Sequence, residues 1–203
     1  MTFLSWLYRK LSPARFVAGP PATSPTSSTS STPRSTGAPK SSERAKQNYH
    51  VETRAKTPNV STKPITPRAV VLHHSGGSYA GGVSWIKNPA SRVSYHVLVA
   101  ADGRRTVFAE PTQRTWHAGK SAWHGKPDLN SWAIGAAFAG DTYAAPLTDA
   151  AMDSMAEYLV PVMHQHGLTL ADVTDHRTVS PGRKDDLKPS ELDRFRSYLA
   201  ARL

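Results

Sequence analysis

Residues 69–75, AVVLHHS, decide the fold, because a run of apolar, mostly branched side chains ends here in two adjacent histidines. A short apolar run of this kind is typical of a buried strand. The glycine-rich residues 75–82, SGGSYAGG, follow directly and predict that the strand leads into a loop. The sequence therefore predicts a central strand that fixes His73 or His74 at its carboxyl end.

Two further stretches predict more of a sheet. Residues 92–110, RVSYHVLVAADGRRTVFAE, contain the turn signal Asp102-Gly103 between two β-rich halves, which favours a hairpin. In the first half, every second residue is apolar or aromatic, namely Val93, Tyr95, Val97 and Val99, and this alternation is typical of a strand. Residues 132–140, WAIGAAFAG, predict another strand, and its small side chains would let a helix cover it closely.

Two amphipathic stretches predict helices. Residues 148–167 begin with Thr148 as a capping residue, and residues 190–203 begin with Ser190 in the same role. The predicted buried faces are Met152, Met155, Tyr158, Leu159 and Val162 in the first helix and Leu192, Phe195, Tyr198 and Leu199 in the second. Strands with interspersed helices predict an α/β or α+β fold.

The first third of the chain differs in composition from the rest. Residues 1–68 hold 11 Lys and Arg against 2 acidic residues, whereas the remainder holds 14 against 13. In residues 20–42, 18 of 23 side chains are Ser, Thr or Pro, which offers too little apolar surface to offset the entropy of ordering. We predict a basic, disordered linker over residues 20–67 and a folded domain over residues 68–203.

Residues 1–19, MTFLSWLYRKLSPARFVAG, predict a short amphipathic segment. Its basic residues follow the apolar cluster, whereas a conventional signal peptide places them before a longer apolar core. We expect no conventional export signal. A frayed terminus, a membrane-surface anchor and a peptide that docks on another protein all fit this segment.

Composition excludes several classes of function. The chain contains no cysteine, so a metal site must use histidine and carboxylate ligands. No apolar run approaches the roughly 20 residues that span a bilayer. The folded part is nearly neutral and carries no nucleic-acid motif, so we expect no specific nucleic-acid partner for it. The basic linker is either a solubilising tether or a contact for polyanions.

Histidine is abundant, with nine in the chain, and two groups stand out. One is the pair at the end of the first strand, and the other is His176 within residues 174–189, TDHRTVSPGRKDDLKP. A loop that turns back at Pro181-Gly182 could present His176 and a carboxylate to one metal ion. Either group alone is more often a hydrogen-bonded or surface histidine, but together they favour a metal site.

These motifs resemble the zinc-dependent N-acetylmuramoyl-L-alanine amidases, a family that includes phage lysozyme-like amidases, muropeptide-recycling amidases and peptidoglycan recognition proteins. The resemblance covers residues 68–203 and rests on VVLHHS, SYHVLVAADG, TWHAGKSAW, LNSWAIGAAFAGD and DHRTVSPGRKDD, in the order of the family. It implies an α/β fold with a single mixed central sheet flanked by helices.

The resemblance also implies a role for each matching residue. His73, His176 and Asp186 match the Zn²⁺ ligands, with Asp185 as the alternative to the last. Lys184 matches a residue that stabilises the oxyanion, and Tyr95 matches a tyrosine beside the zinc. His117 and Trp116 match the lining of the substrate groove, and His96 looks either like a support for a zinc ligand or like a structural residue.

One position departs from the family. Recycling amidases carry a glutamate that serves as general base where this chain has Ala137. The phage lysozyme-like branch also lacks that acid and keeps the tyrosine and lysine. The departure therefore leaves catalysis possible but removes one candidate for the proton transfer.

The resemblance implies cleavage of the amide bond between N-acetylmuramic acid and L-alanine of peptidoglycan. We expect a monomer made in the cytoplasm that acts on the cell wall, as in host lysis or on a virion. Two alternatives are a peptidoglycan-binding module without catalysis and a structural virion protein. Trp116, Trp123 and Trp132 offer flat faces to a glycan, although we expect at least two of them to pack in the core.

Overall fold

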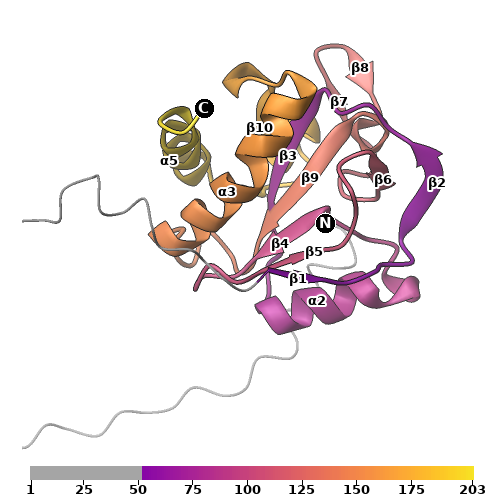
Figure 1. Cartoon of the computed structure of the whole chain (residues 1–203), viewed down its shortest axis with the longest axis horizontal. Helices are drawn as coiled ribbons and strands as arrows, with labels where there is room; N and C mark the ends of the chain where they lie inside the picture. The colour runs from indigo at the N-terminus through magenta and orange to yellow at the C-terminus, as the bar shows by residue number, and fades with distance from the viewer. Residues whose placement is uncertain (1–51) are drawn as a thin grey trace, which may run out of the picture. The chain divides into compact units, whose positions relative to one another are not determined.

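The computed structural model describes residues 52–203 (Figure 1). The predicted amphipathic segment 1–19 and most of the predicted linker lie outside the described residues. A six-stranded mixed sheet forms the centre of the described part, in the order β1-β5-β4-β9-β3-β10. Its strands are β1 (Glu52–Arg54), β3 (Ala69–His74), β4 (Val97–Val99), β5 (Arg105–Val107), β9 (Ala133–Phe138) and β10 (Val173–Asp175).

Only the β4–β5 pair of this sheet is antiparallel, and the predicted hairpin at Asp102-Gly103 joins these two strands. The pairs β1–β5, β4–β9, β9–β3 and β3–β10 are parallel. Two small antiparallel ribbons accompany the sheet. They pair β2 (Val60–Pro64) with β6 (Gln113–Thr115) and β7 (Ala122–Trp123) with β8 (Lys126–Pro127). The predicted single mixed sheet is confirmed.

Helices cover both faces of the sheet (Figure 1). The larger core lies between the sheet and α3 (Asp149–His166) and α5 (Pro189–Ala200), where the rings of Phe138 and Phe195 meet edge to face at 5.3 Å. On the opposite face, Ile86 of α2 (Tyr79–Lys87) packs against Leu98 and Phe108. Burial of each such side chain contributes about 1.5–3 kcal/mol. Because both faces are covered, β3 and β9 are apolar almost throughout.

The predicted helix after β9 is confirmed, and Thr148 caps it by accepting a hydrogen bond from the Ala151 amide. The C-terminal helix α5 is also present, but the predicted cap was wrong. The helix begins at Pro189 with Lys188 in the capping position, so Ser190 lies inside it. Proline is favoured at the first position of a helix because that position needs no amide hydrogen bond. None of the helices described is long and apolar enough to cross a membrane.

The prediction of a loop after the first strand was incomplete, because α2 begins within the glycine-rich stretch. Ser78 caps it by accepting a hydrogen bond from the Gly81 amide. A Cβ atom on Gly82 would lie 2.8 Å from Leu98 Cδ2. This glycine therefore lets the helix approach β4 closely. Glycine is a poor helix former, so packing against the sheet outweighs its low helix propensity here.

The predicted boundary at residue 67 was also wrong, because β1 and β2 lie before it. Polar contacts hold this segment in place. Asn59 is 1% exposed, and its side-chain amide donates to the carbonyls of Ile86, Asn88 and Val93. Low hydrophobicity concealed this order, since buried hydrogen bonds to the backbone help to hold the segment in place.

A buried arginine anchors β1 in the same way. The Arg105 guanidinium lies 2.9 Å from Glu52 of β1 and 3.0 Å from Glu157 of α3. It also donates to the carbonyl of Ser154. Burial lowers the pKa of Arg105, but the two carboxylates outweigh this effect and raise it, so the side chain remains charged.

Candidate metal centre

The ends of two neighbouring strands form the site. Strands β3 and β10 run parallel, and Leu72 pairs with Asp175. His73 directly follows Leu72, and His176 directly follows Asp175, so the two histidines lie side by side where the paired strands end. His73 ends the buried part of β3, and His176 opens the short helix α4 (His176–Val179). Asp175 caps this helix by accepting a hydrogen bond from the Thr178 amide. The sheet thus brings together two histidines that are 103 positions apart.

A turn returns the chain to the same point. Ser180 accepts backbone hydrogen bonds from Arg183 and Lys184, and Gly182 adopts a φ of +72° that favours glycine. The Arg177 amide then donates to the carbonyl of Asp186 at 2.7 Å. The predicted turn at Pro181-Gly182 is present, and it places Asp186 beside the strand ends.

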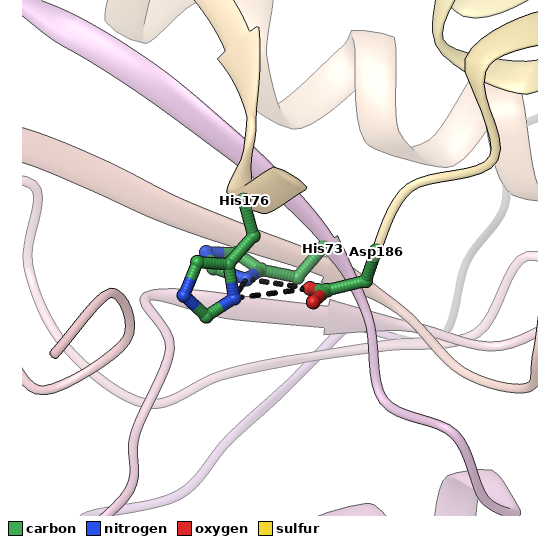
Figure 2. A group of neighbouring side chains, drawn as sticks. All are labelled: His73, His176 and Asp186. Carbon is green, nitrogen blue, oxygen red and sulfur yellow. Dashed lines mark hydrogen bonds and ion pairs between the residues drawn. The ribbon is translucent and has the colours of Figure 1, made fainter. Parts of the chain in front are cut away.

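Figure 2 shows the side chains of His73, His176 and Asp186 pointing toward one another. His73 Nδ1 lies 3.0 Å from both His176 Nδ1 and Asp186 Oδ2. His176 Nδ1 lies 3.2 Å from Asp186 Oδ2. All three residues are buried, with exposed fractions of 0%, 4% and 6%. Within the described residues, this His-His-Asp group can hold a metal ion.

The surrounding hydrogen bonds fix where the imidazole protons lie. His176 Nε2 is 3.1 Å from the carbonyl oxygen of Ala118, which can only accept, and 3.5 Å from the guanidinium of Arg183, which can only donate. The shorter contact places the proton on Nε2. His117 Nε2 likewise donates to the carbonyl oxygen of Ala133 at 3.2 Å. In neutral His117, Nδ1 is therefore an acceptor, and it receives the Nε2 proton of His73 at 3.1 Å. Both His73 and His176 consequently turn an unprotonated Nδ1 toward Asp186.

This arrangement fits a cation. Burial, together with the neighbouring His176, lowers the pKa of His73 to about 4. Burial raises the pKa of Asp186, but the adjacent imidazoles of His176 and His73 outweigh burial and hold the pKa below its ordinary range. At neutral pH, two nitrogen lone pairs and a carboxylate oxygen therefore face one point. Three acceptors this close repel one another unless a positive ion lies among them.

Two other predicted residues lie near this point. The ring of Tyr95 packs against that of His73, with 5.0 Å between the centroids. Burial raises the pKa of the Tyr95 hydroxyl, and the charge of Asp186 adds to the effect. Lys184 is half-buried, and its charge contributes to the low pKa of His73. Tyr95 therefore brings a protonated hydroxyl to the site, and Lys184 brings a positive charge.

The structure corrects the predicted role of His117. This side chain lies behind His73 and is 5% exposed, and protein atoms occupy both of its ring nitrogens. It cannot line an open groove. Sequence reasoning missed its contact with His73, although Gly135 within a strand was a usable signal, because such a glycine often marks a close approach. A Cβ on Gly135 would lie 2.3 Å from His117 Cγ.

The three tryptophans that could face a glycan differ in their contacts. The indole of Trp116 donates to Ser61 of β2 at 3.1 Å, and its predicted groove role stays a prediction. Trp132 is buried, and Trp123 packs against the same cluster, so two of the three tryptophans pack in the core as expected. Lys126 lies 4.8 Å above the Trp132 ring.

His74 and His96 lie outside the three-atom group. His74 bonds to Thr142, which also accepts a hydrogen bond from the Lys188 amide. His96 bonds to the carbonyl of Gln113 and the amide of Gly135, which favours the structural one of its two predicted roles. Ala137 pairs with His73 across β3 and β9. Paired residues of parallel strands share a face, so an acid at position 137 would lie beside His73.

A buried His-His-Asp group at the carboxyl ends of a mixed sheet defines an α/β protein with a candidate single-metal centre. The chain belongs to the N-acetylmuramoyl-L-alanine amidase family, whose model matches residues 62–189. The match includes all three candidate ligands.

Individual relatives agree with this assignment. The chain is 40% identical to N-acetylmuramoyl-L-alanine amidase A of Achromobacter lyticus over 65 residues, 32% of this chain and 37% of that protein. It is 33% identical to 1,6-anhydro-N-acetylmuramyl-L-alanine amidase AmpD of Haemophilus influenzae over 111 residues, 54% and 59% of the two chains. The matched regions thus span about 37–59% of these two relatives.

Solved structures share the fold. A selenomethionine derivative of AmpD superposes with a TM-score of 0.65 at 24% identity, over 73% of this chain and 94% of that one. A mutant endolysin from Bacillus subtilis superposes with a TM-score of 0.59 at 18% identity, over 73% and 97%. At these identities, the likeness concerns the fold.

Proposed function

We propose that this protein is a zinc-dependent N-acetylmuramoyl-L-alanine amidase. It would hydrolyse the amide bond between the lactyl group of N-acetylmuramic acid and L-alanine of the stem peptide. The observation that carries the proposal is the convergence of two unprotonated imidazole nitrogens and one carboxylate oxygen in a member of this family.

Zinc suits this donor set better than the common alternatives. Two histidine nitrogens and one carboxylate oxygen are a three-ligand set found in catalytic zinc sites, whereas magnesium and calcium prefer oxygen ligands throughout. His73 and His176 would bind through Nδ1 and Asp186 through Oδ2. Bound zinc would polarise the amide carbonyl and acidify water enough for attack near neutral pH.

Tyr95 and Lys184 would stabilise the charge that develops on the carbonyl oxygen. Tyr95 keeps its hydroxyl proton because burial raises its pKa, so it can donate a hydrogen bond but cannot serve as a base. Lys184 supplies a positive charge close to His73. Preorganised donors of this kind typically contribute a factor of 10²–10³ to turnover.

Relatives suggest the substrate class. AmpDh3 of Pseudomonas aeruginosa was solved with an anhydromuramic pentapeptide, and AmiD of Escherichia coli with anhydro-N-acetylmuramic acid-L-Ala-D-γ-Glu-L-Lys. We extend this class, a muramyl sugar joined to a stem peptide, to the present chain. The site of action would be the cell wall, and an endolysin-like role is favoured by the fold shared with the Bacillus subtilis protein.

Purified sacculi test the proposal. The zinc-loaded protein is expected to release stem peptides that begin with L-alanine, identified by mass spectrometry, and a chelator should stop the release. His176→Ala should lose both zinc and activity, whereas the matched variant His74→Ala should keep both. Lys184→Ala should keep zinc and lose about 10²-fold or more in turnover.

A wall-binding module is the second candidate, and Ala137 favours it because it removes a general base. In that case, the zinc-loaded protein would sediment with sacculi without releasing peptides.

The paired histidine variants test the ligand assignment separately. Equal losses of activity in His74→Ala and His176→Ala would refute it.

A further inference from the structure

His117 and Ala118 are adjacent residues, and together they contact both candidate zinc histidines. The ring of His117 accepts the Nε2 proton of His73, and the carbonyl oxygen of Ala118 accepts the Nε2 proton of His176. The proposed chemistry uses neither residue. Their position between the two imidazoles, on the side away from Asp186, therefore needs its own explanation.

One buried side chain anchors this pair. Asn130 is 8% exposed, and its Oδ1 accepts hydrogen bonds from the backbone amides of both His117, at 3.0 Å, and Ala118, at 2.8 Å. Arg183 holds the Ala118 carbonyl from the other side at 2.6 Å. The backbone of the pair is thus fixed at three points.

The ring of His117 is fixed as firmly as its backbone. Its Nε2 donates to the Ala133 carbonyl, and its face rests on Gly135, where a Cβ atom would lie within 2.3–2.7 Å of the ring and Cβ of His117. Because Nε2 of the ring donates to the Ala133 carbonyl, Nδ1 is left to accept the Nε2 proton of His73 at 3.1 Å.

We propose that His117-Ala118 is a positioning element that selects the metal-binding tautomer of both His73 and His176. With the Nε2 protons engaged, each imidazole keeps its Nδ1 lone pair for the ion. The opposite tautomer would place a proton where the ion binds. This inference rests on the proposed zinc site, and neither residue contacts the reacting atoms.

The two halves of the element differ in a way that can be measured. A backbone carbonyl fixes His176, and a side-chain substitution at position 117 leaves that carbonyl in place. A side chain fixes His73, so substitution at His117 should release His73 alone. His117→Phe removes the acceptor, and His117→Asn keeps an amide oxygen that can accept the His73 proton.

Ring ¹⁵N chemical shifts of the zinc-free full chain report the tautomers directly. In the unsubstituted protein, both His73 and His176 should carry the proton on Nε2. In His117→Phe, His73 should become a mixture of tautomers while His176 is unchanged. In the same variant, zinc affinity in a chelator competition should fall about 10–100-fold, and His117→Asn should recover part of it.

A buried histidine directly before β4 supplies the matched control. His96 bonds to the Gly135 amide but to neither candidate ligand, so His96→Phe should leave the tautomer of His73 unchanged. The proposal fails if His73 keeps its Nε2 proton in His117→Phe, if His73 and His176 change together, or if His96→Phe weakens zinc as much. If the unsubstituted protein binds zinc with these tautomers but releases no stem peptides, the proposed function fails and the positioning role stands.

Discussion

Gly135→Ala is the sharpest structural perturbation of this site, because it adds one methyl group at a point where no space exists. The new Cβ would lie 2.3 Å from Cγ, 2.7 Å from Cβ and 2.7 Å from Cδ2 of His117. The His117 ring cannot move aside without leaving His73 and the Ala133 carbonyl. In an ordinary strand, the same change would stabilise by about 0.5–1 kcal/mol, so the predicted sign is opposite to the general trend.

The expected cost combines two effects. Overpacking of a tight interior costs about 1–3 kcal/mol. Loss of the two hydrogen bonds of His117 adds about 1 kcal/mol each, and more if a buried partner stays unsatisfied. We expect the free energy of unfolding to fall by about 3–5 kcal/mol. Zinc affinity should fall about 10–100-fold, because the support of His73 is lost.

Urea unfolding followed by far-ultraviolet circular dichroism measures the first quantity, and chelator competition measures the second. Gly82→Ala is the matched control, since its Cβ would lie 2.8 Å from Cδ2 of Leu98 and none of its nearest neighbours is a candidate ligand. We expect Gly82→Ala to cost about 0–2 kcal/mol of stability, because overpacking costs about 1–3 kcal/mol and alanine favours a helix by about 1 kcal/mol, and to leave zinc binding unchanged. If Gly135→Ala is as stable as the parent and binds zinc equally well, the inferred close packing of His117 against Gly135 is refuted.

Two further predictions concern stability. Buried His73 and His96 each have a pKa of about 4, against 6.5 when unfolded. Between these two pH values, both side chains are protonated in the unfolded chain and neutral in the folded chain. In the presence of chelator, stability should fall by about 2 kcal/mol per histidine from pH 7.5 to 5, and less steeply in His96→Gln. Asn59→Ala should cost about 2–3 kcal/mol, because several buried carbonyls lose their donor. Urea titrations check both, and a pH-independent midpoint or an unaffected Asn59→Ala would contradict them.

The central elements were predictable because their patterns are local. The run before His73, the turn at Asp102-Gly103 and the face of α3 each carry their own periodicity or turn signal. Strand order is different, because it depends on pairings between distant segments. The meeting of His73 with His176 follows from the parallel β3–β10 pair. The residues alone favoured a metal site from both histidine groups, and the family resemblance was needed to choose His73 over His74.

The missed features depend on single contacts. Helix α2 contains glycines that propensity disfavours, and its close fit to Leu98 became visible only in three dimensions. Strand β1 depends on one buried arginine, and the segment before residue 67 depends on Asn59. The role of His117 rests on a tautomer, which spacing along the chain cannot reveal. Asn130 left no signal in the sequence, since a lone asparagine is most often a turn residue.

The short strand β1 has a consequence for how the protein behaves in solution. It covers the outer edge of β5, and its Glu52 supplies one of the two carboxylates around Arg105. A chain trimmed to the family match, starting at residue 62, would expose unpaired backbone groups along β5 and leave that guanidinium with half of its counter-charge. Open edges of this kind recruit strands from neighbouring molecules. Such a shortened protein should therefore self-associate, even though every candidate metal ligand would still be present.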